Sequence, residues 1–105
     1  MNNKNIPQPG EINIELDEQI GQGIYSNLAI ISHSNSEFVI DFVRLMPAMP
    51  KAKVQSRIIL TPEHAKRLLM ALKDNIQKFE SQFGVIRVVE APPLPLNFGG
   101  PKGEA

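Results

Sequence analysis

Alternation of apolar and polar residues predicts four strands in the first sixty residues. Ile12, Ile14 and Leu16 alternate with polar residues, which is the period of a half-buried strand. Three further runs are rich in β-branched and aromatic residues and are separated by turn-forming serine, asparagine, glycine and proline. They span residues 24–33, 37–46 and 53–60.

A three- and four-residue period then predicts one long helix over residues 61–83. Thr61 is a favourable N-cap, Pro62 suits the first helical position and Gly84 suits the position after the last turn. One apolar stripe runs through Ala65, Leu68, Leu69, Leu72, Ile76, Phe79 and Phe83. Residues 85–89 return to a β-type composition and predict a fifth strand. The fold class is therefore α+β, a mostly antiparallel four- to five-stranded sheet with one long helix packed on one face.

The turn at Ser34-Asn35-Ser36 predicts how the second and third runs pair. A three-residue loop places His33 opposite Glu37 and gathers large apolar side chains on one face, as a seat for the helix. That face holds Leu28, Ile30, Phe38, Ile40 and Phe42. The other face carries more apolar residues than a solvent-exposed face of a sheet normally does, and the sequence predicts no second helix to cover it. We therefore expect a homo-oligomer, most simply a dimer, with an interface near Tyr25, Ile31, Val39 and Val43.

Composition narrows the class of protein further. The 105 residues carry 11 basic and 11 acidic side chains and no cysteine, so disulfides, thiol catalysis and cysteine-bound zinc are excluded. We expect a leader over residues 1–10, one domain over 11–90 and a proline- and glycine-rich tail over 91–105. No apolar targeting segment or membrane-length run is evident, so we expect a cytoplasmic location.

Candidate catalytic and metal-binding groups are few. Asp41 lies within an apolar run, where it is a general base with a raised pKa, the partner of a cation such as Arg44 or Arg57, or exposed to solvent at the rim of an interface. His33 and His64 lack the spacing of a zinc site, so we expect neither metal nor cofactor. Gly21-Gln22-Gly23 has no third glycine and predicts a turn rather than a phosphate loop.

Charge is segregated along the chain. Residues 51–67 carry a net charge of +4 and residues 11–18 a net charge of −4. The basic stretch contains Lys51, Lys53, Arg57, Lys66 and Arg67. It either contacts nucleic acid or complements the acidic stretch within or between subunits. The tail presents Leu94, Leu96 and Phe98, which either dock on a neighbouring subunit or partner or have no structural part.

Several of these segments together resemble a known family. They are Ile24-Tyr25-Ser26-Asn27-Leu28, Glu37-Phe38-Val39-Ile40-Asp41-Phe42 and Thr61-Pro62-Glu63-His64-Ala65-Lys66. Over roughly residues 11–84 the chain resembles short bacterial and archaeal proteins that form a domain of unknown function, which implies a compact β-rich domain with one long helix. The proline-leucine tail and the sheet-plus-helix pattern are more distantly similar to the secretion chaperone SecB.

These observations favour a non-enzymatic, homo-oligomeric protein-interaction module. The reason is that the predicted sheet has more apolar surface than one helix can cover, while no group of residues has the pattern of a catalytic site. One alternative is a SecB-like binder of peptides or unfolded clients. A second alternative is a nucleic-acid-binding protein that uses residues 51–67.

Overall fold

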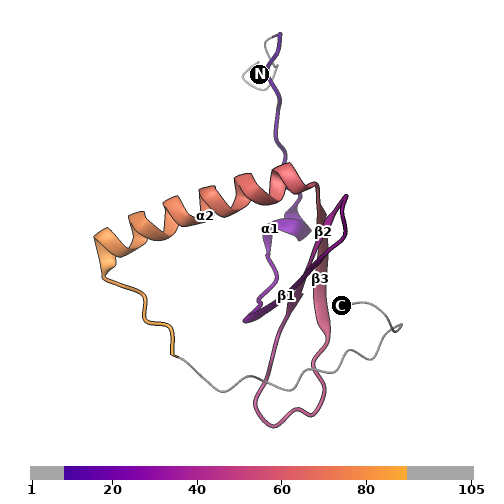
Figure 1. Cartoon of the computed structure of the whole chain (residues 1–105), viewed down its shortest axis with the longest axis vertical. Helices are drawn as coiled ribbons and strands as arrows, with labels where there is room; N and C mark the ends of the chain where they lie inside the picture. The colour runs from indigo at the N-terminus through magenta and orange to yellow at the C-terminus, as the bar shows by residue number, and fades with distance from the viewer. Residues whose placement is uncertain (1–8, 90–105) are drawn as a thin grey trace.

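Three strands and one long helix form the fold in a computed structural model that describes residues 9–89 (Figure 1). A single helical turn, α1 (Glu18–Gly21), precedes them. The strands are β1 (Leu28–His33), β2 (Phe38–Val43) and β3 (Val54–Leu60), and the helix is α2 (Pro62–Phe83). The α+β class is confirmed, and the described residues form three strands rather than the four or five expected.

The sheet is antiparallel in the order β1-β2-β3. The β1–β2 register differs by one residue from the prediction, because His33 lies opposite Phe38 instead of Glu37. The loop therefore has four residues. Its closure explains the difference: the Ser34 amide donates to the Glu37 carbonyl at 2.9 Å, and the Ser34 hydroxyl accepts from the amides of Ser36 and Glu37.

This register redistributes the apolar side chains between the two faces of the sheet, since successive residues of a strand point to opposite faces. The first face, here called the Asp41 face, carries Leu28, Ile30, Ser32, Val39, Asp41, Val43, Arg57 and Ile59. The second, the Ile31 face, carries Ala29, Ile31, His33, Phe38, Ile40, Phe42, Ile58 and Leu60. The predicted seat for the helix is therefore wrong, because Leu28 and Ile30 lie on the face opposite to the three β2 residues.

The predicted helix is confirmed in its position and in both of its ends. The Thr61 side chain accepts a hydrogen bond from the His64 amide at 3.2 Å, and Pro62 begins the helix, where its missing N–H leaves no bond unmade. Gly84 follows the last turn with φ of 105°, a conformation that favours glycine, and its amide donates to the Glu80 carbonyl.

The expected packing of the helix against the sheet is absent. α2 makes almost no contact with the strands, and none of its residues is buried. A single residue, Thr61, connects β3 to α2, so the helix starts directly at the end of the strand. Figure 1 shows α2 running away from the three strands. Among the described residues, the buried apolar core consists of Val43 and Leu60 alone.

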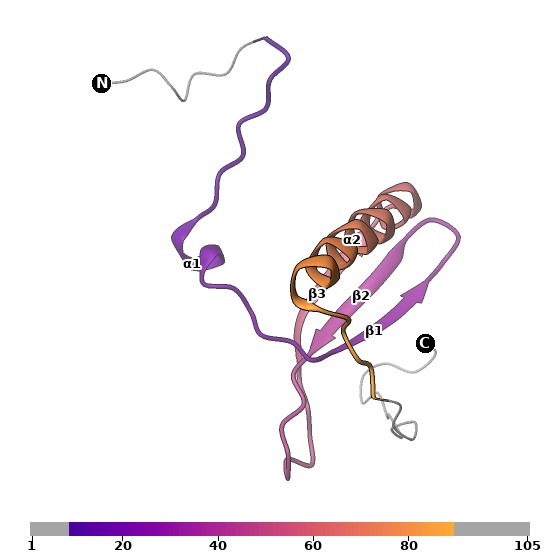
Figure 2. The same cartoon turned by 90° about the vertical axis from the view of Figure 1, so that its left-hand side faces the viewer.

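Two predicted strands are also wrong. Residues 12–16 and 85–89 do not form strands, and their apolar side chains are exposed. A strand needs a neighbour to complete its hydrogen-bonding ladder, and neither segment lies beside a sheet edge. Residues 9–27 lead away from the sheet as an extended arm interrupted by α1 (Figure 2). The Ile86 amide bonds instead to the Glu80 carboxylate at 3.0 Å.

Candidate functional site

The apolar stripe of α2 is the most conspicuous surface of the described chain. Its members are far more exposed than the side chains of a protein core. The exposed fractions are Leu68 40%, Leu69 62%, Leu72 55%, Ile76 39%, Phe79 47% and Phe83 68%. Phe79 and Phe83 contact each other with ring centroids 5.0 Å apart, so the end of the stripe is a small aromatic pair. Contiguous exposed apolar surface of this kind marks an interaction site.

The other side of α2 is polar and exposed to solvent. Two ion pairs between residues four apart hold it, Arg67–Glu63 at 2.8 Å and Lys78–Asp74 at 3.1 Å. The helix therefore has one solvated side and one apolar side, the form of a helix that packs against something. Within residues 9–89 the strands barely contact α2, and none of its residues is buried.

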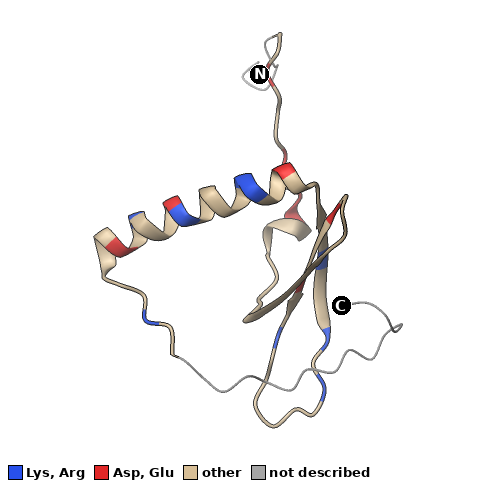
Figure 3. Cartoon of the chain, viewed as in Figure 1, with Lys and Arg blue, Asp and Glu red and all other residues tan. Residues whose placement is uncertain are grey.

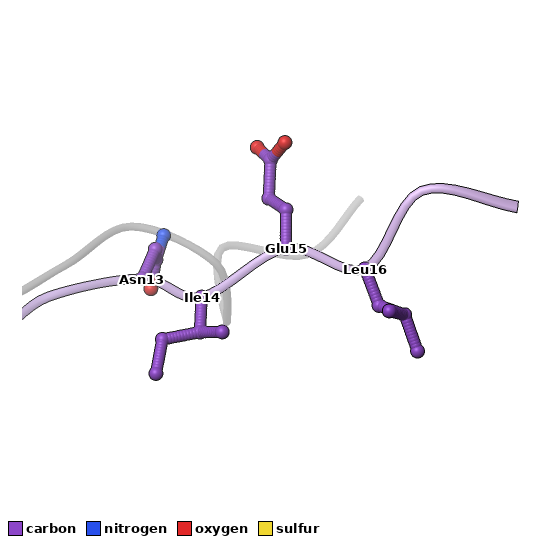
Figure 4. A pocket seen from close by; sticks show the side chains of 4 residues that line it. All are labelled: Asn13, Ile14, Glu15 and Leu16. Atoms are coloured by element: carbon purple, nitrogen blue, oxygen red, sulfur yellow. The ribbon is translucent and has the colours of Figure 1, made fainter. Parts of the chain in front are cut away.

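The arm that precedes β1 is a second exposed apolar segment. Five large side chains along it are at least 61% exposed, namely Ile12, Ile14, Leu16, Ile20 and Ile24. Figure 4 shows Glu15 on the opposite side of the arm from Ile14 and Leu16, as alternation requires. The hollow beside these residues is open and is lined by Asn13 to Leu16 alone, so it does not bring separate parts of the chain together.

Asp41 lies in the middle of the sheet and is paired with a cation. It is 3% exposed and directly opposite Arg57, whose Nε and Nη2 atoms donate to the two carboxylate oxygens at 2.7 and 2.8 Å. Hydrogen bonding from Arg57 lowers the pKa of Asp41 below its usual value, outweighing the opposing effect of burial. Of the alternatives expected for Asp41, the pairing with a cation is the one present, and Arg57 is that cation.

Other candidate groups do not converge on Asp41. His33 lies on the Ile31 face, where it stacks on Phe38 at a centroid distance of 5.4 Å, so the sheet separates it from Asp41. His64 lies in the first turn of α2. In residues 9–89 no three histidine or acidic side chains gather as metal ligands. Gly21 is the last residue of α1, Gln22 follows it as a turn, and Gly23 has a φ of 80°.

The residues predicted at an oligomer interface do not form one surface. Tyr25 and Ile31 are 66% and 61% exposed. Val39 and Val43 lie on the Asp41 face, opposite to Ile31, and Val43 is buried within its own chain. The four residues therefore occupy both faces of the sheet. The predicted docking residues Leu94, Leu96 and Phe98 lie outside the described residues.

The predicted nucleic-acid contacts are divided between two ends of β3 (Figure 3). Lys51 and Lys53 precede the strand, whereas Lys66 and Arg67 lie on α2 beyond its other end. About nine residues of extended chain separate Lys53 from the start of α2, which is roughly 30 Å. Arg57 and Arg67 are both engaged by carboxylates. The five side chains therefore do not make one continuous basic surface.

The sequence pattern located the α2 stripe but assigned it to the core. Periodicity shows that a helix side requires burial, and it does not show whether the covering surface belongs to the same chain. The single-residue connection between Leu60 and Pro62 is the signal that could have indicated the difference.

No described helix is long and apolar enough to pass through a bilayer.

Comparison with known proteins confirms the family resemblance. The model of the family described as a protein of unknown function, DUF3467, matches residues 1–88, and the chain belongs to this family. No curated protein and no solved structure matches the chain. The family assignment carries no activity or ligand, so the function has to be argued from the surfaces described above.

Proposed function

We propose that this member of the DUF3467 family is a non-enzymatic module that associates with itself and buries the α2 stripe between copies. The observation that supports the proposal is the placement of α2. A 22-residue amphipathic helix projects from a three-stranded sheet with its apolar side open. A helix of this length gains most of its stability from tertiary packing, and the described residues of its own chain supply very little of it.

The size of the open surface fits a dimer. Six side chains, each about half exposed, leave on the order of 600 Å² of apolar area on each copy. Two such surfaces together approach the roughly 1,200 Å² at which stable interfaces begin. Because a two-fold axis brings the same patch of both copies together, the stripe of one copy covers the stripe of the other.

The small core gives an independent reason for association. A body of about 80 residues is marginal even when its hydrophobic surfaces are packed. Among the described residues, only Val43 and Leu60 are buried apolar residues. Ile31 and Ile58 are exposed on the Ile31 face, one on each side of Ile40. Association therefore supplies a core that the single chain lacks.

Native mass tests this proposal. Light scattering with size-exclusion chromatography on the full chain at micromolar concentration is expected to give at least twice the monomer mass of 11.7 kDa. A single 11.7 kDa species across the concentration range contradicts self-association. A hydrophobic dye gives a second readout: burial of the stripe between copies predicts weak dye binding by the intact assembly.

The same stripe supports a second candidate function, the chaperone-like capture of extended apolar peptides. Exposed leucine and phenylalanine side chains on a helix offer sites for unfolded segments. This function requires apolar surface to stay open after assembly. Strong dye binding by the assembled protein, together with suppressed aggregation of an unfolded client, favours it over simple self-association.

A further inference from the structure

We infer that the loop between β2 and β3, residues 44–53, docks on an anionic lipid surface. Both views of the chain show this loop extending beyond the strands (Figures 1 and 2). It lies at the end of β3 opposite to α2, so the site does not depend on the proposed association through the α2 stripe. Two features of the loop lead to a lipid surface: an apolar tip with a defined turn, and three cations behind that tip.

The tip of the loop consists of five residues without a polar side chain, Met46-Pro47-Ala48-Met49-Pro50. All five are exposed, and the two methionines are 46% and 58% exposed. Methionine side chains are flexible and polarizable, so they adapt to irregular apolar surroundings. The tip therefore presents apolar surface that acyl chains can cover.

A turn defines the shape of the tip. The Met49 amide donates to the Met46 carbonyl at 3.2 Å, and Pro47 and Ala48 occupy the two central positions. Ala48 has a φ of 66°, which together with the preceding proline is the arrangement of a type II turn. That φ normally favours glycine, so an alanine here is strained, and strained residues gather at binding sites. The turn holds the Cα atoms of both methionines within about 7 Å of each other, so they form one apolar end.

The base of the loop is anchored to the sheet. The Asn27 side chain accepts a hydrogen bond from the Leu45 amide at 2.7 Å and donates one to the Leu45 carbonyl at 3.0 Å. Asn27 thereby continues the pairing of the strands by one residue into the loop. A segment ordered at its base and at its tip loses less conformational entropy on docking.

Three cations lie behind the tip on the two arms of the loop. Arg44 directly follows β2, and Lys51 and Lys53 come just before β3. The sequence has no acidic residue between Asp41 and Glu63, and Figure 3 shows basic segments on both arms of the loop. Among the described residues, none of the three cations forms an ion pair. The loop therefore has a net charge of +3, which attracts an anionic surface.

The distance between the cations and the tip fits a membrane interface. Lys51 is three residues from Ala48 in the turn, which is at most about 10 Å of extended chain. Interfacial segments bury their apolar side by about 5–10 Å at the boundary of headgroups and acyl chains. With the tip at that depth, the cations lie at the level of the lipid phosphates.

A lipid surface fits this loop better than a nucleic acid does. Nucleic-acid sites combine their cations with aromatic side chains that stack on bases or with polar side chains that read base edges. Residues 45–50, between Arg44 and Lys51, contain neither kind of side chain. Binding to an oligonucleotide is therefore the alternative that the experiment has to separate.

Co-sedimentation of the full chain with vesicles tests the inference. Vesicles of phosphatidylcholine and phosphatidylserine in equal parts are expected to bind the protein, vesicles of phosphatidylcholine alone are expected to bind far less, and added salt is expected to weaken the binding. Equal binding to both vesicles, or binding to neither, contradicts a site for anionic lipid. Binding to a single-stranded oligonucleotide without binding to the anionic vesicles also overturns it.

A charge variant tests whether the loop is the part that binds. Lys51→Gln with Lys53→Gln is expected to weaken binding to the anionic vesicles about thirtyfold, since each cation near the surface contributes about fivefold. Lys66→Gln with Lys73→Gln removes two exposed lysines of α2 and is the matched control, which is expected to bind as the wild type does. Equal losses in both double variants would assign the attraction to the whole chain rather than to the loop.

A methionine pair tests insertion of the tip. Met49 and Met70 are 58% and 62% exposed, so replacing either with serine removes a similar apolar surface. Met49→Ser is expected to weaken vesicle binding about fivefold, because its side chain enters the interface. Met70→Ser, on α2, is expected to leave it unchanged. If both variants bind as the wild type does while far-ultraviolet circular dichroism shows them folded, the tip does not insert and the inference fails.

Discussion

A charge placed on the α2 stripe should dissociate the assembly, and the helix offers a matched control for it. Leu69 and Met70 are both 62% exposed in the chain, so replacing either with aspartate costs the single chain about the same. They differ in direction, because successive helical residues are turned by about 100°. Leu69 lies on the stripe with Leu72 and Ile76, whereas Met70 is turned toward the solvated side of the helix.

The expected size of the effect follows from the exposed area of Leu69. Burial of the exposed 62% of a leucine removes roughly 120 Å² from water and contributes about 3 kcal/mol. In a two-fold dimer both copies lose this contribution, so Leu69→Asp weakens the dimer by about 6 kcal/mol. That change raises Kd by about four orders of magnitude. A dimer that forms at micromolar concentration then becomes a monomer under the same conditions.

The assay compares native mass for the wild type, Leu69→Asp and Met70→Asp by light scattering, with far-ultraviolet circular dichroism as a check on folding. Leu69→Asp is expected to run as a monomer and Met70→Asp at the wild-type mass. If both variants keep the wild-type mass, or both dissociate to the same extent, the stripe is not the interface and the reasoning from α2 is refuted.

Three further predictions concern the sheet and the helix cap. Because hydrogen bonds from Arg57 hold the folded pKa of Asp41 below its unfolded value, the pair stabilises the fold above the unfolded pKa. Wild-type stability should therefore fall as pH drops below about 4, and urea titrations should show a shallower fall for Asp41→Asn. Arg57→Met, which leaves the buried Asp41 unpaired, should cost about 3–5 kcal/mol of unfolding free energy, against about 1–2 for Asp41→Asn, whose remaining guanidinium is largely exposed. Equal losses would show that burial of the carboxylate is not the dominant cost. Thr61→Ala should lower stability by about 1 kcal/mol in thermal melts while Thr61→Ser retains the cap, and an unchanged alanine variant would contradict a stabilising cap.

The sequence by itself determined the local elements. The N-cap at Thr61, the proline after it and the glycine at 84 define the ends of α2, because capping and backbone preferences act within a few residues. β-branched runs located β1, β2 and β3 for a similar reason. The family resemblance over the same segments was also visible from the residues alone and is confirmed.

Only the tertiary structure decided what those elements pack against. One additional residue in the hairpin loop moved Ile31 and Val39 to opposite faces, since a strand reverses its faces with every residue. The separate pairing of β2 with β3 placed Arg57 opposite Asp41, where it donates two hydrogen bonds to that carboxylate. α2 starts one residue after β3 and barely contacts the strands, so its apolar stripe stays open. Apolar periodicity records the need for burial, whereas the identity of the covering surface is a property of the arrangement in space.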